Sequence, residues 1–418
     1  MSLAPPDALP GRIAGALRAR FLAVRALPVF SPAAVRGTFA SGRHPAETSH
    51  VPHAEGAIDW LCAAQDACGG GGIARGYSLT YSPYFRSRGW QPAYPETTGY
   101  IIPTLLSAAR FFGRPELAER ALLAARWEVR VQLADGAVRG GVMGEPESPA
   151  IFNTGQVMLG WLASWEERGD DAFAAALARA GRFLAACEQD GRFVKGNSRF
   201  ARGDATAYNA RAAWALAEAG VALNDGEMVD AAARVLRDVA ASQHANGWFP
   251  RCCLNDPERP LLHTLAYTVR GLLEGGRVLE DAALVASARL AAERLAAAVG
   301  PDGWMPGRFS SDWRGAASWS CLTGQAQMAN NWLRLREMEG GDRWLEPARR
   351  SLAFLKTTQD RETPERGVRG GLAGSDPPGG EYGRWEMLSW AAKFFADALM
   401  RDHAARGRPG GAPVSRLA

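Results

Sequence analysis

Long apolar runs are absent from this 418-residue sequence, in which none approaches the roughly 18 to 20 residues of a membrane-spanning helix. A strong charge of either sign is also absent, because 48 basic residues nearly balance 44 acidic ones and leave a net charge of +4. The arginines are scattered among the acids rather than gathered with aromatic residues into one stripe. We therefore expect a soluble globular protein and do not expect nucleic acid as a partner.

Cysteine and histidine are scarce, with six of each in the chain. The cysteines form no CxxC pair and follow no secretory leader, so the sequence predicts no disulfide framework and fits a reducing cytoplasm. The histidines show no metal-ligand spacing, and only His263 lies in a strongly apolar helical context. We expect neither a structural zinc ion nor a cofactor.

Acidic residues are absent between Asp7 and Glu47, where the segment LPGRIAGALRARFLAVRALPVF carries four arginines. We interpret residues 1–50 as a basic arm that packs on or near the rest of the chain, because its apolar part is short and its prolines end it early. A helix that lies on a membrane surface is the alternative.

A repeat of about 55 to 60 residues organises the rest of the chain. Gly-rich turns such as VAASQHANGWFPR recur, and each is followed by a polar loop and a second helical segment such as LHTLAYTVRGLLEGGRVL. Helical segments of one kind are amphipathic, whereas those of the other kind are apolar almost all round and should be buried on several sides. Six of each predict an all-α protein with a single domain over residues 51–403. That domain is an (α/α)6 toroid of six inner and six outer helices, and we expect a disordered tail at 404–418.

The inner helices of such a ring run parallel, so the polar residues in front of them gather at one mouth together with free backbone N–H groups. A single Thr, Asn or Ser at these positions also fits a helix cap. The catalytic candidates at this mouth are Tyr267, His263, Glu96, Tyr208 and Glu386. The predicted substrate-binding residues are Tyr94, Tyr100, Asn153, Asn209, Arg211, Arg251, Arg270, Asp312, Trp313, Trp319, Gln325, Tyr382 and Trp385.

Spacings of three or four residues place three pairs on shared helix faces: His263 with Tyr267, Tyr382 with Glu386, and Tyr208 with Arg211. Aromatic faces stack on the C–H surfaces of sugars, while carboxylates, amides and arginines bind hydroxyl groups, so this composition predicts a glycan ligand. Other aromatics should only fill the ring, as we expect for Trp161, Trp214 and Trp332 farther along their helices.

Two strings carry a resemblance to a known family. GYSLTYSPYFRSRGWQPAYPETTGYIIPTLL and NGWFPRCCLNDPERPLLHTLAYTVRGLLEGG resemble VpsJ-type polysaccharide biosynthesis proteins of bacterial exopolysaccharide gene clusters, over about Glu55 to about Leu399. The resemblance implies a pathway of bacterial surface polysaccharide synthesis and supplies no catalytic assignment. More distantly the chain resembles N-acylglucosamine 2-epimerases, glucuronyl C5-epimerases, and the (α/α)6 polysaccharide lyases and glycoside hydrolases. The paired catalytic histidines of the 2-epimerases are not visible here.

Two other classes of protein compete with a carbohydrate enzyme. Strings such as SQHANGWF resemble the turns of triterpene cyclases and protein prenyltransferases, but no DxDD acid occurs, and Cys253, Asp256 and His263 do not match the prenyltransferase zinc pattern. A non-catalytic protein that binds an oligosaccharide or polysaccharide is the other alternative, since a lined cavity can hold a polymer without cutting it.

Among carbohydrate reactions the residues permit two. Proton transfer beside a uronate carboxylate, as in epimerases and lyases, would use Tyr267, His263 and Tyr208, with Arg211 stabilising the negative charge. Hydrolysis would use paired carboxylic groups, with Glu96 and either Glu386 or Asp312. We favour proton transfer, because the predicted mouth holds more tyrosine and arginine than paired acid.

Overall fold

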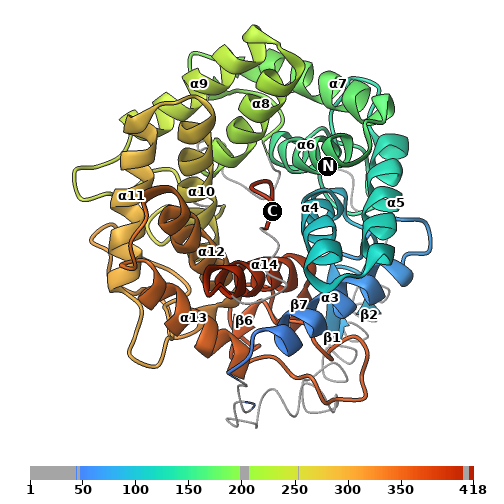
Figure 1. Cartoon of the computed structure of the whole chain (residues 1–418), viewed down its shortest axis with the longest axis vertical. Helices are drawn as coiled ribbons and strands as arrows, with labels where there is room; N and C mark the ends of the chain where they lie inside the picture. The colour runs from blue at the N-terminus through green and yellow to red at the C-terminus, as the bar shows by residue number, and fades with distance from the viewer. Residues whose placement is uncertain (1–43, 45–47, 198–206, 253, 408–413) are drawn as a thin grey trace, which may run out of the picture.

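The structure, a computed structural model, describes residues 44, 48–197, 207–252, 254–407 and 414–418. Twelve α-helices in these residues form two concentric layers around one axis (Figure 1), so the predicted (α/α)6 toroid is confirmed. The inner helices are α4 (Pro95–Phe112), α6 (Ile151–Arg168), α8 (Ala210–Leu223), α10 (Leu262–Val278), α12 (Leu322–Glu339) and α14 (Ser389–Ala405). The outer helices are α3 (Val51–Asp66), α5 (Pro115–Val131), α7 (Asp171–Cys187), α9 (Gly226–Ala241), α11 (Ala282–Ala297) and α13 (Leu345–Thr357).

The inner ring closes because α14 packs against both α12 and α4, the first inner helix. Its helices are buried on nearly every side, and Trp161, Trp214 and Trp332 are completely buried, as predicted for packing residues. The indole N–H of Trp161 donates to the carbonyl of Ala125 on α5, and that of Trp332 donates to the carbonyl of Ala292 on α11. These tryptophans therefore join the inner layer to the outer one.

Glycines set the close spacing of the inner helices. A Cβ atom on Gly271 of α10 would lie 2.3 Å from the carbonyl carbon of Ala210 on α8, and one on Gly155 of α6 would lie 2.6 Å from the Cα of Ala212. Neither distance leaves room for a methyl group. The absence of a side chain lets the helix backbones touch, which narrows the ring.

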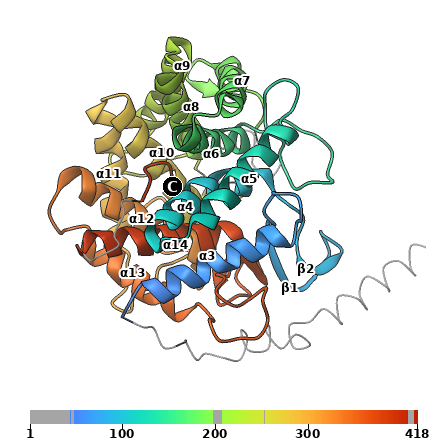
Figure 2. The same cartoon turned by 45° about the vertical axis from the view of Figure 1, so that its right-hand side comes forward.

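Short strands lie in the loops at the mouth where the inner helices begin. β1 (Gly76–Ser82) pairs antiparallel with β2 (Ser87–Trp90) (Figure 2). It also pairs antiparallel with β7 (Glu386–Leu388), labelled in Figure 1, which joins the first repeat to the last. The other elements are β3 (Glu188–Gln189), β4 (Arg192–Phe193), β5 (Ser320–Cys321), β6 (Ser375–Asp376) and the 3-10 turn η2 (Ala207–Asn209). Helix α14 begins only at Ser389, so Tyr382 and Glu386 do not share a helix face as predicted.

Two predictions concern the ends of the chain: a basic arm at residues 1–50 and a disordered tail at 404–418. Most of the basic arm, and with it the predicted membrane contact, lies outside the described residues, whereas His50 is buried and its Nε2 lies 2.8 Å from Asp402 Oδ2 on α14. No described helix has the length and hydropathy needed to cross a membrane. The disordered tail expected at 404–418 differs from the structure, in which α14 continues to Ala405. Residues 414–418 also pack inside the ring, as the complete burial of Leu417 shows.

Candidate active site

A cavity of about 390 Å³ opens at the mouth formed by the inner-helix N-termini. Eight of the predicted site residues line it, and they come from all of the inner repeats except the fifth, α12: Tyr94, Glu96, Asn153, Tyr208, His263, Tyr267, Tyr382 and Glu386. The remaining lining residues were not predicted from the sequence: Arg75, Tyr84, Phe85, Gly141, Val142, Phe152, Leu254, Thr264 and Trp390.

Glu96 lies in the first turn of α4, where the helix dipole favours a negative charge. The hydroxyl of Tyr94 donates a hydrogen bond of 2.5 Å to Glu96 Oε2, and the Asn153 side-chain amide lies 3.4 Å from that hydroxyl. Burial outweighs both this hydrogen bond and the nearby arginines, and raises the pKa of Glu96 to about 7. The carboxyl group can therefore be protonated near neutral pH and donate a proton.

Glu386 is the second acid of the cavity, and it is held at both oxygens. Arg75 Nη1 donates to Oε2 over 2.9 Å, and Gln91 Nε2 donates to Oε1 over 2.9 Å. Arg75 Nη1 also donates to the Gln91 side-chain oxygen over 2.7 Å, and the guanidinium lies 5.0 Å from the centre of the Trp390 ring. This triad ties β7 to the segment around β1 and fixes a cation at the cavity wall.

His263 lines the cavity as a neutral imidazole. Its Nδ1 lies 2.9 Å from Gln327 Oε1 on α12, and because an amide oxygen only accepts hydrogen bonds, Nδ1 carries the proton. Burial lowers the pKa of the imidazole to about 3, so the ring is neutral at physiological pH. Nε2 therefore has a free lone pair on a ring that lines the cavity.

Tyr267 lies one turn after His263 on α10, and the two rings are 4.4 Å apart, so the predicted shared helix face is correct. Burial raises the pKa of Tyr267 far above its ordinary value, so its hydroxyl stays protonated. Tyr100, a predicted binding residue, does not line the cavity. Its ring stacks on that of Phe394, with 5.7 Å between the ring centres.

Tyr267 forms the part of the cavity wall that we call the floor. Arg211 lies behind the Tyr267 ring and does not line the cavity. Its guanidinium stands 5.3 Å from the Tyr267 ring centre, and Nε donates to Gln156 Oε1 over 2.6 Å. It is 1% exposed, and its Nη2 has no hydrogen-bond partner among the described residues. Tyr208, in the turn η2, lines the cavity without it, so the predicted Tyr208–Arg211 pair does not act on one face of the site.

The other predicted binding residues of the third and fourth repeats lie outside the cavity. Asn209 bonds to Asn197 Oδ1, and Arg251 lies 3.6 Å from Asp238 on α9. Arg270 is two turns beyond His263 on α10 and points to the opposite end of the ring, where it binds residues 414–418. The turn η2 and the loop before α10 direct Asn209 and Arg251 toward neighbouring elements, whereas Arg270 lies too far along α10 to reach the mouth.

The predictions for the loops before α12 and α14 are also corrected. Asp312 is an exposed partner of Arg314, and Trp313 donates its indole N–H to the Asn246 carbonyl. Trp319 packs against Gly307 and Gly380, and Trp385 packs beside Gly379. Gln325 lies in the first turn of α12, where it accepts a hydrogen bond from Ser320 and donates one to the Gly303 carbonyl. Because Asp312 lies elsewhere, its predicted pairing with Glu96 does not form.

Two of the missed residues had signals in the sequence. Arg75 directly precedes the string GYSLTYSPYFRSRGW, and Phe85 lies within it; the alternating aromatic and small residues of this string form the β1–β2 hairpin at the mouth. Trp390 is in the first turn of α14, which begins at Ser389, later than the helix start near Tyr382 that the sequence suggested. Its indole N–H donates to the Tyr382 hydroxyl over 2.8 Å.

The described residues contain no group of three His, Cys, Asp or Glu side chains that could hold a metal ion. Cys253, one of the three residues weighed against the prenyltransferase zinc pattern, lies outside them. The neutral His263 is bound to an amide rather than to a carboxylate.

Comparisons with known proteins support the fold. No protein-family model matches the chain, and no curated protein matches it. An unsaturated glucuronyl hydrolase specific for heparin has a TM-score of 0.67 at 15% identity, covering 86% of this chain and 98% of that one. The unsaturated glucuronyl hydrolase from Bacillus sp. GL1 has a TM-score of 0.66 at 15% identity, covering 84% and 96%. Cellobiose 2-epimerase from Bacillus thermoamylovorans B4167 has a TM-score of 0.64 at 9% identity, covering 84% and 98%. At these identities the likeness establishes the fold.

Proposed function

We propose that this protein is an enzyme that modifies a glycan by moving a proton at a sugar carbon, as epimerases and lyases do. The observation that carries the proposal is that a neutral histidine and a protonatable carboxyl group line one cavity. His263 has a free Nε2 lone pair, and the pKa of Glu96 is raised to about 7 by burial. At neutral pH such a pair supplies a proton acceptor and a proton donor. Because burial makes the free imidazole a weak base, the proposal requires negative charge on the bound substrate to raise the pKa of His263.

His263 is the base in this proposal. The carbonyl oxygen of Gln327 holds the Nδ1 proton, which fixes the tautomer and aims Nε2 away from α12. Tyr267, the other sequence candidate, is unsuited to this task because the pKa of its hydroxyl is raised far above neutrality. It serves instead as a neutral hydrogen-bond donor that supports negative charge on the substrate.

Glu96 is the acid. Tyr94 donates to one of its oxygens and thereby orients the carboxyl group at the start of α4. A carboxyl group with a pKa of about 7 is protonated in a large fraction of molecules at neutral pH, and the carboxylate formed after proton donation is stabilised by the Tyr94 hydrogen bond and by Arg75.

The walls of the cavity suit a sugar with an acidic group. Aromatic rings from Tyr94, Tyr382 and Trp390 offer faces for the C–H surfaces of a pyranose. Arg75 is the only Lys or Arg among the described lining residues, and its two hydrogen bonds both leave from Nη1, so Nη2 faces a ligand carboxylate in this proposal. The similarity to enzymes that act on glucuronyl sugars supports a uronate, and the resemblance to exopolysaccharide proteins supports a role in surface polysaccharide synthesis.

Hydrolysis of a glycosidic bond is the second candidate, favoured by the presence of two carboxylic groups in one cavity. Glu96 would protonate the leaving oxygen, and Glu386 would activate water or attack the sugar. We rank this reaction second because both oxygens of Glu386 already accept hydrogen bonds from Arg75 and Gln91, which turns them toward these partners rather than toward water or a sugar carbon.

The test is incubation of the protein in deuterium oxide with uronate-containing and neutral oligosaccharides. Proton transfer predicts deuterium at C5 of the uronate, or an unsaturated product, with no new reducing ends from neutral glycans. New reducing ends that appear with water addition would favour hydrolysis. Saturable binding without any chemical change to the sugars would instead favour a non-catalytic glycan-binding protein and would contradict the enzyme proposal.

A further inference from the structure

Residues 414–418, called the strap below, lie inside the ring, where Figure 1 marks the C-terminus. The cavity is lined by the first turns of the inner helices, whereas the strap contacts later turns, such as those of Ser107 on α4 and Arg401 on α14. Leu417 is 0% exposed and Ala418 is 1% exposed. The strap therefore occupies a site enclosed by the ring itself.

Five of the six inner helices bind the strap directly. Ser107 on α4 accepts a hydrogen bond of 3.1 Å from the Ser415 amide, and Arg401 on α14 donates over 3.1 Å to the Ser415 carbonyl. Arg416 pairs with Glu166 on α6 at 2.6 Å and with Glu218 on α8 at 3.3 Å. Arg270 on α10 donates from Nη2 to the carbonyls of Arg416 and Ala418 over 2.9 and 3.0 Å.

Arg270 needs these carbonyl groups. It is 2% exposed, and its nearest carboxylate, Glu274 at 3.3 Å, is also paired with Arg334 and Arg277. A buried cation that loses its hydrogen-bond acceptors is costly in free energy. The site beneath the strap is therefore incomplete without a peptide that brings carbonyl oxygens to Arg270.

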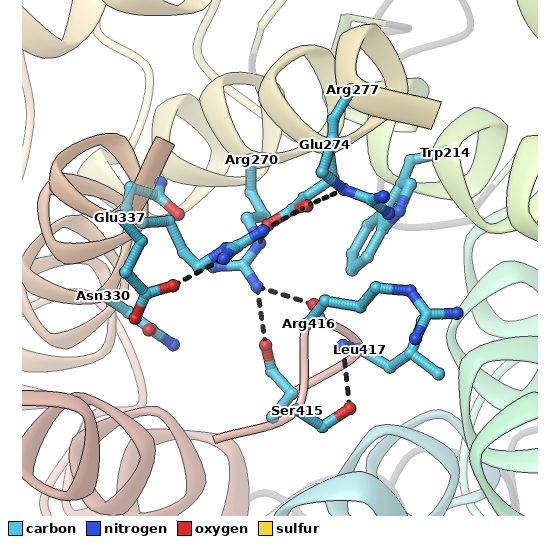
Figure 3. A network of polar contacts seen from close by, with 12 residues as sticks. Trp214, Arg270, Glu274, Arg277, Asn330, Glu337, Ser415, Arg416 and Leu417 are labelled. Carbon is cyan, nitrogen blue, oxygen red and sulfur yellow. Dashed lines mark hydrogen bonds and ion pairs between the residues drawn. The ribbon is translucent and has the colours of Figure 1, made fainter. Parts of the chain in front are cut away.

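A series of cation–π contacts connects this site to Tyr267 at the cavity floor. The Arg270 guanidinium lies 5.6 Å from the Trp214 ring centre, and the Arg211 guanidinium lies 5.2 Å from the same ring. Arg211 in turn lies 5.3 Å from the ring of Tyr267. Figure 3 shows Trp214 and Arg270 beside the strap, labelled at Ser415, Arg416 and Leu417.

We propose that this end of the ring is a peptide-docking site whose ligand is the strap, and that docking holds the cavity floor in place through Arg270, Trp214 and Arg211. The ligand class is a short extended peptide with two carbonyls for Arg270, an arginine for the glutamates of α6 and α8, and a leucine for the enclosed pocket. Docking itself is independent of the proposed function, whereas the effect on the floor rests on it.

The test of docking uses the full chain with Leu417→Asp, which places a charge in the pocket and weakens the strap in cis. The probe is an acetylated peptide with the sequence Val-Ser-Arg-Leu-Ala, added in trans and followed by calorimetry. We expect this variant to melt lower than the parent, to bind the peptide and to regain its melting temperature when the peptide is added. The parent, whose site is filled, should not bind it.

Three controls make the result specific. Leu123→Asp makes the same chemical change at an exposed leucine of α5 and should neither lower the melting temperature much nor create peptide binding. A scrambled peptide should not bind, and adding Arg270→Gln to Leu417→Asp should abolish binding. If Leu417→Asp does not fold, Arg416→Ala replaces it. A stable Leu417→Asp or Arg416→Ala chain that binds no peptide, or binding that survives Arg270→Gln, would overturn the docking site.

The effect on the floor is measured in the same samples. Displacement of catalytic groups by about 1 Å can cost up to about 100-fold in rate, so we expect turnover to fall by roughly 10- to 100-fold in Leu417→Asp and to return with the peptide, with KM less affected. Peptide binding without any change in turnover would refute the coupling to the floor alone. A parent protein that turns over no sugar would refute the proposed function and leave the docking result standing.

Discussion

At the scale of single residues, the burial of a side chain determines its protonation state and therefore which role it can take in the proposed reaction. His263 and Tyr267 share a helix face, yet burial affects them oppositely, because it favours the uncharged form of each. In the proposed mechanism the uncharged histidine therefore accepts a proton, whereas the uncharged tyrosine does not. The spacing of the two residues predicted their proximity, and only their burial distinguishes their roles.

We expect His263→Asn to lower turnover by roughly 10² to 10⁴-fold, since it removes the general base and leaves the pairing with Gln327 possible. Tyr267→Phe should lower turnover much less, because the ring still fills the floor and only a neutral donor is lost. Steady-state kinetics on both variants, with melting temperatures as the folding control, check this. A greater loss in Tyr267→Phe than in His263→Asn would make the tyrosine the base.

Glu96 links stability to pH. Its pKa is raised from 4.5 to about 7, so the folded protein binds more protons than the unfolded chain between these values. Stability should therefore fall as pH rises from about 4.5 to about 7 and change little from this source above that range. Glu96→Gln removes the ionising group, and its stability relative to the parent should be higher at pH 8 than at pH 5, by at most about 3 kcal/mol.

Thermal melts of the parent and Glu96→Gln at pH 5 and pH 8 measure this difference. Turnover of the parent should also decline above about pH 7, as the acid form of Glu96 is lost. An equal stability difference at both pH values would show that Glu96 does not carry the raised pKa. Turnover that is flat from pH 6 to pH 9 would remove Glu96 from the role of acid.

At the scale of elements, glycine contacts decide how closely the inner helices approach. Gly271→Ala should destabilise the protein by about 1 to 3 kcal/mol, because the new methyl group would meet the α8 backbone at 2.3 Å. Gly226→Ala is the matched control, since no atom lies within 4 Å of its Cβ position at the start of α9. We expect that variant to be neutral or up to about 1 kcal/mol more stable. Chemical denaturation would contradict the packing argument if both changes had the same effect.

The β1–β2 hairpin is the element that should distinguish long from short substrates. Tyr84 and Phe85 lie at its turn, line the cavity, and form an edge-on ring pair 4.9 Å apart, with Tyr84 55% exposed. Exposed aromatic rings at a sugar site can stack on the next sugar unit. Phe85→Ala should raise KM for oligosaccharides while leaving KM for a monosaccharide glycoside nearly unchanged, and an equal rise for both would place the ring at the reacting sugar instead.

At the scale of the whole molecule, the closed inner ring makes each repeat depend on its neighbours. The packing of α14 against α4 leaves no inner helix with an open side, and the strap adds contacts to five of them. We expect hydrogen exchange to be slowest in the inner helices and unfolding to be one cooperative transition. Two separate transitions by independent probes would contradict the single domain predicted for residues 51–403.

The sequence by itself determined the helix count, the alternation of inner and outer helices and the mouth at which polar residues gather. These depend on local periodicity and on caps and turns, which a short stretch of chain displays directly. It located Glu96, His263 and Tyr267, because each lies in the first turns of an inner helix whose direction the repeat already defines.

Only the tertiary structure decided which loop residues reach the cavity and what each group can do there. Arg75 meets Glu386 from the opposite end of the sequence, across strands that no periodicity revealed, and Asp312 and Trp313 turn outward because their loop packs against its neighbours. Residues 414–418 belong to the tail that we expected from the sequence to be disordered, yet they pack inside the ring. The partners of Arg416 come from helices that are far from it in the sequence. Burial and long-range pairing depend on all repeats at once, so they exist only in the folded ring.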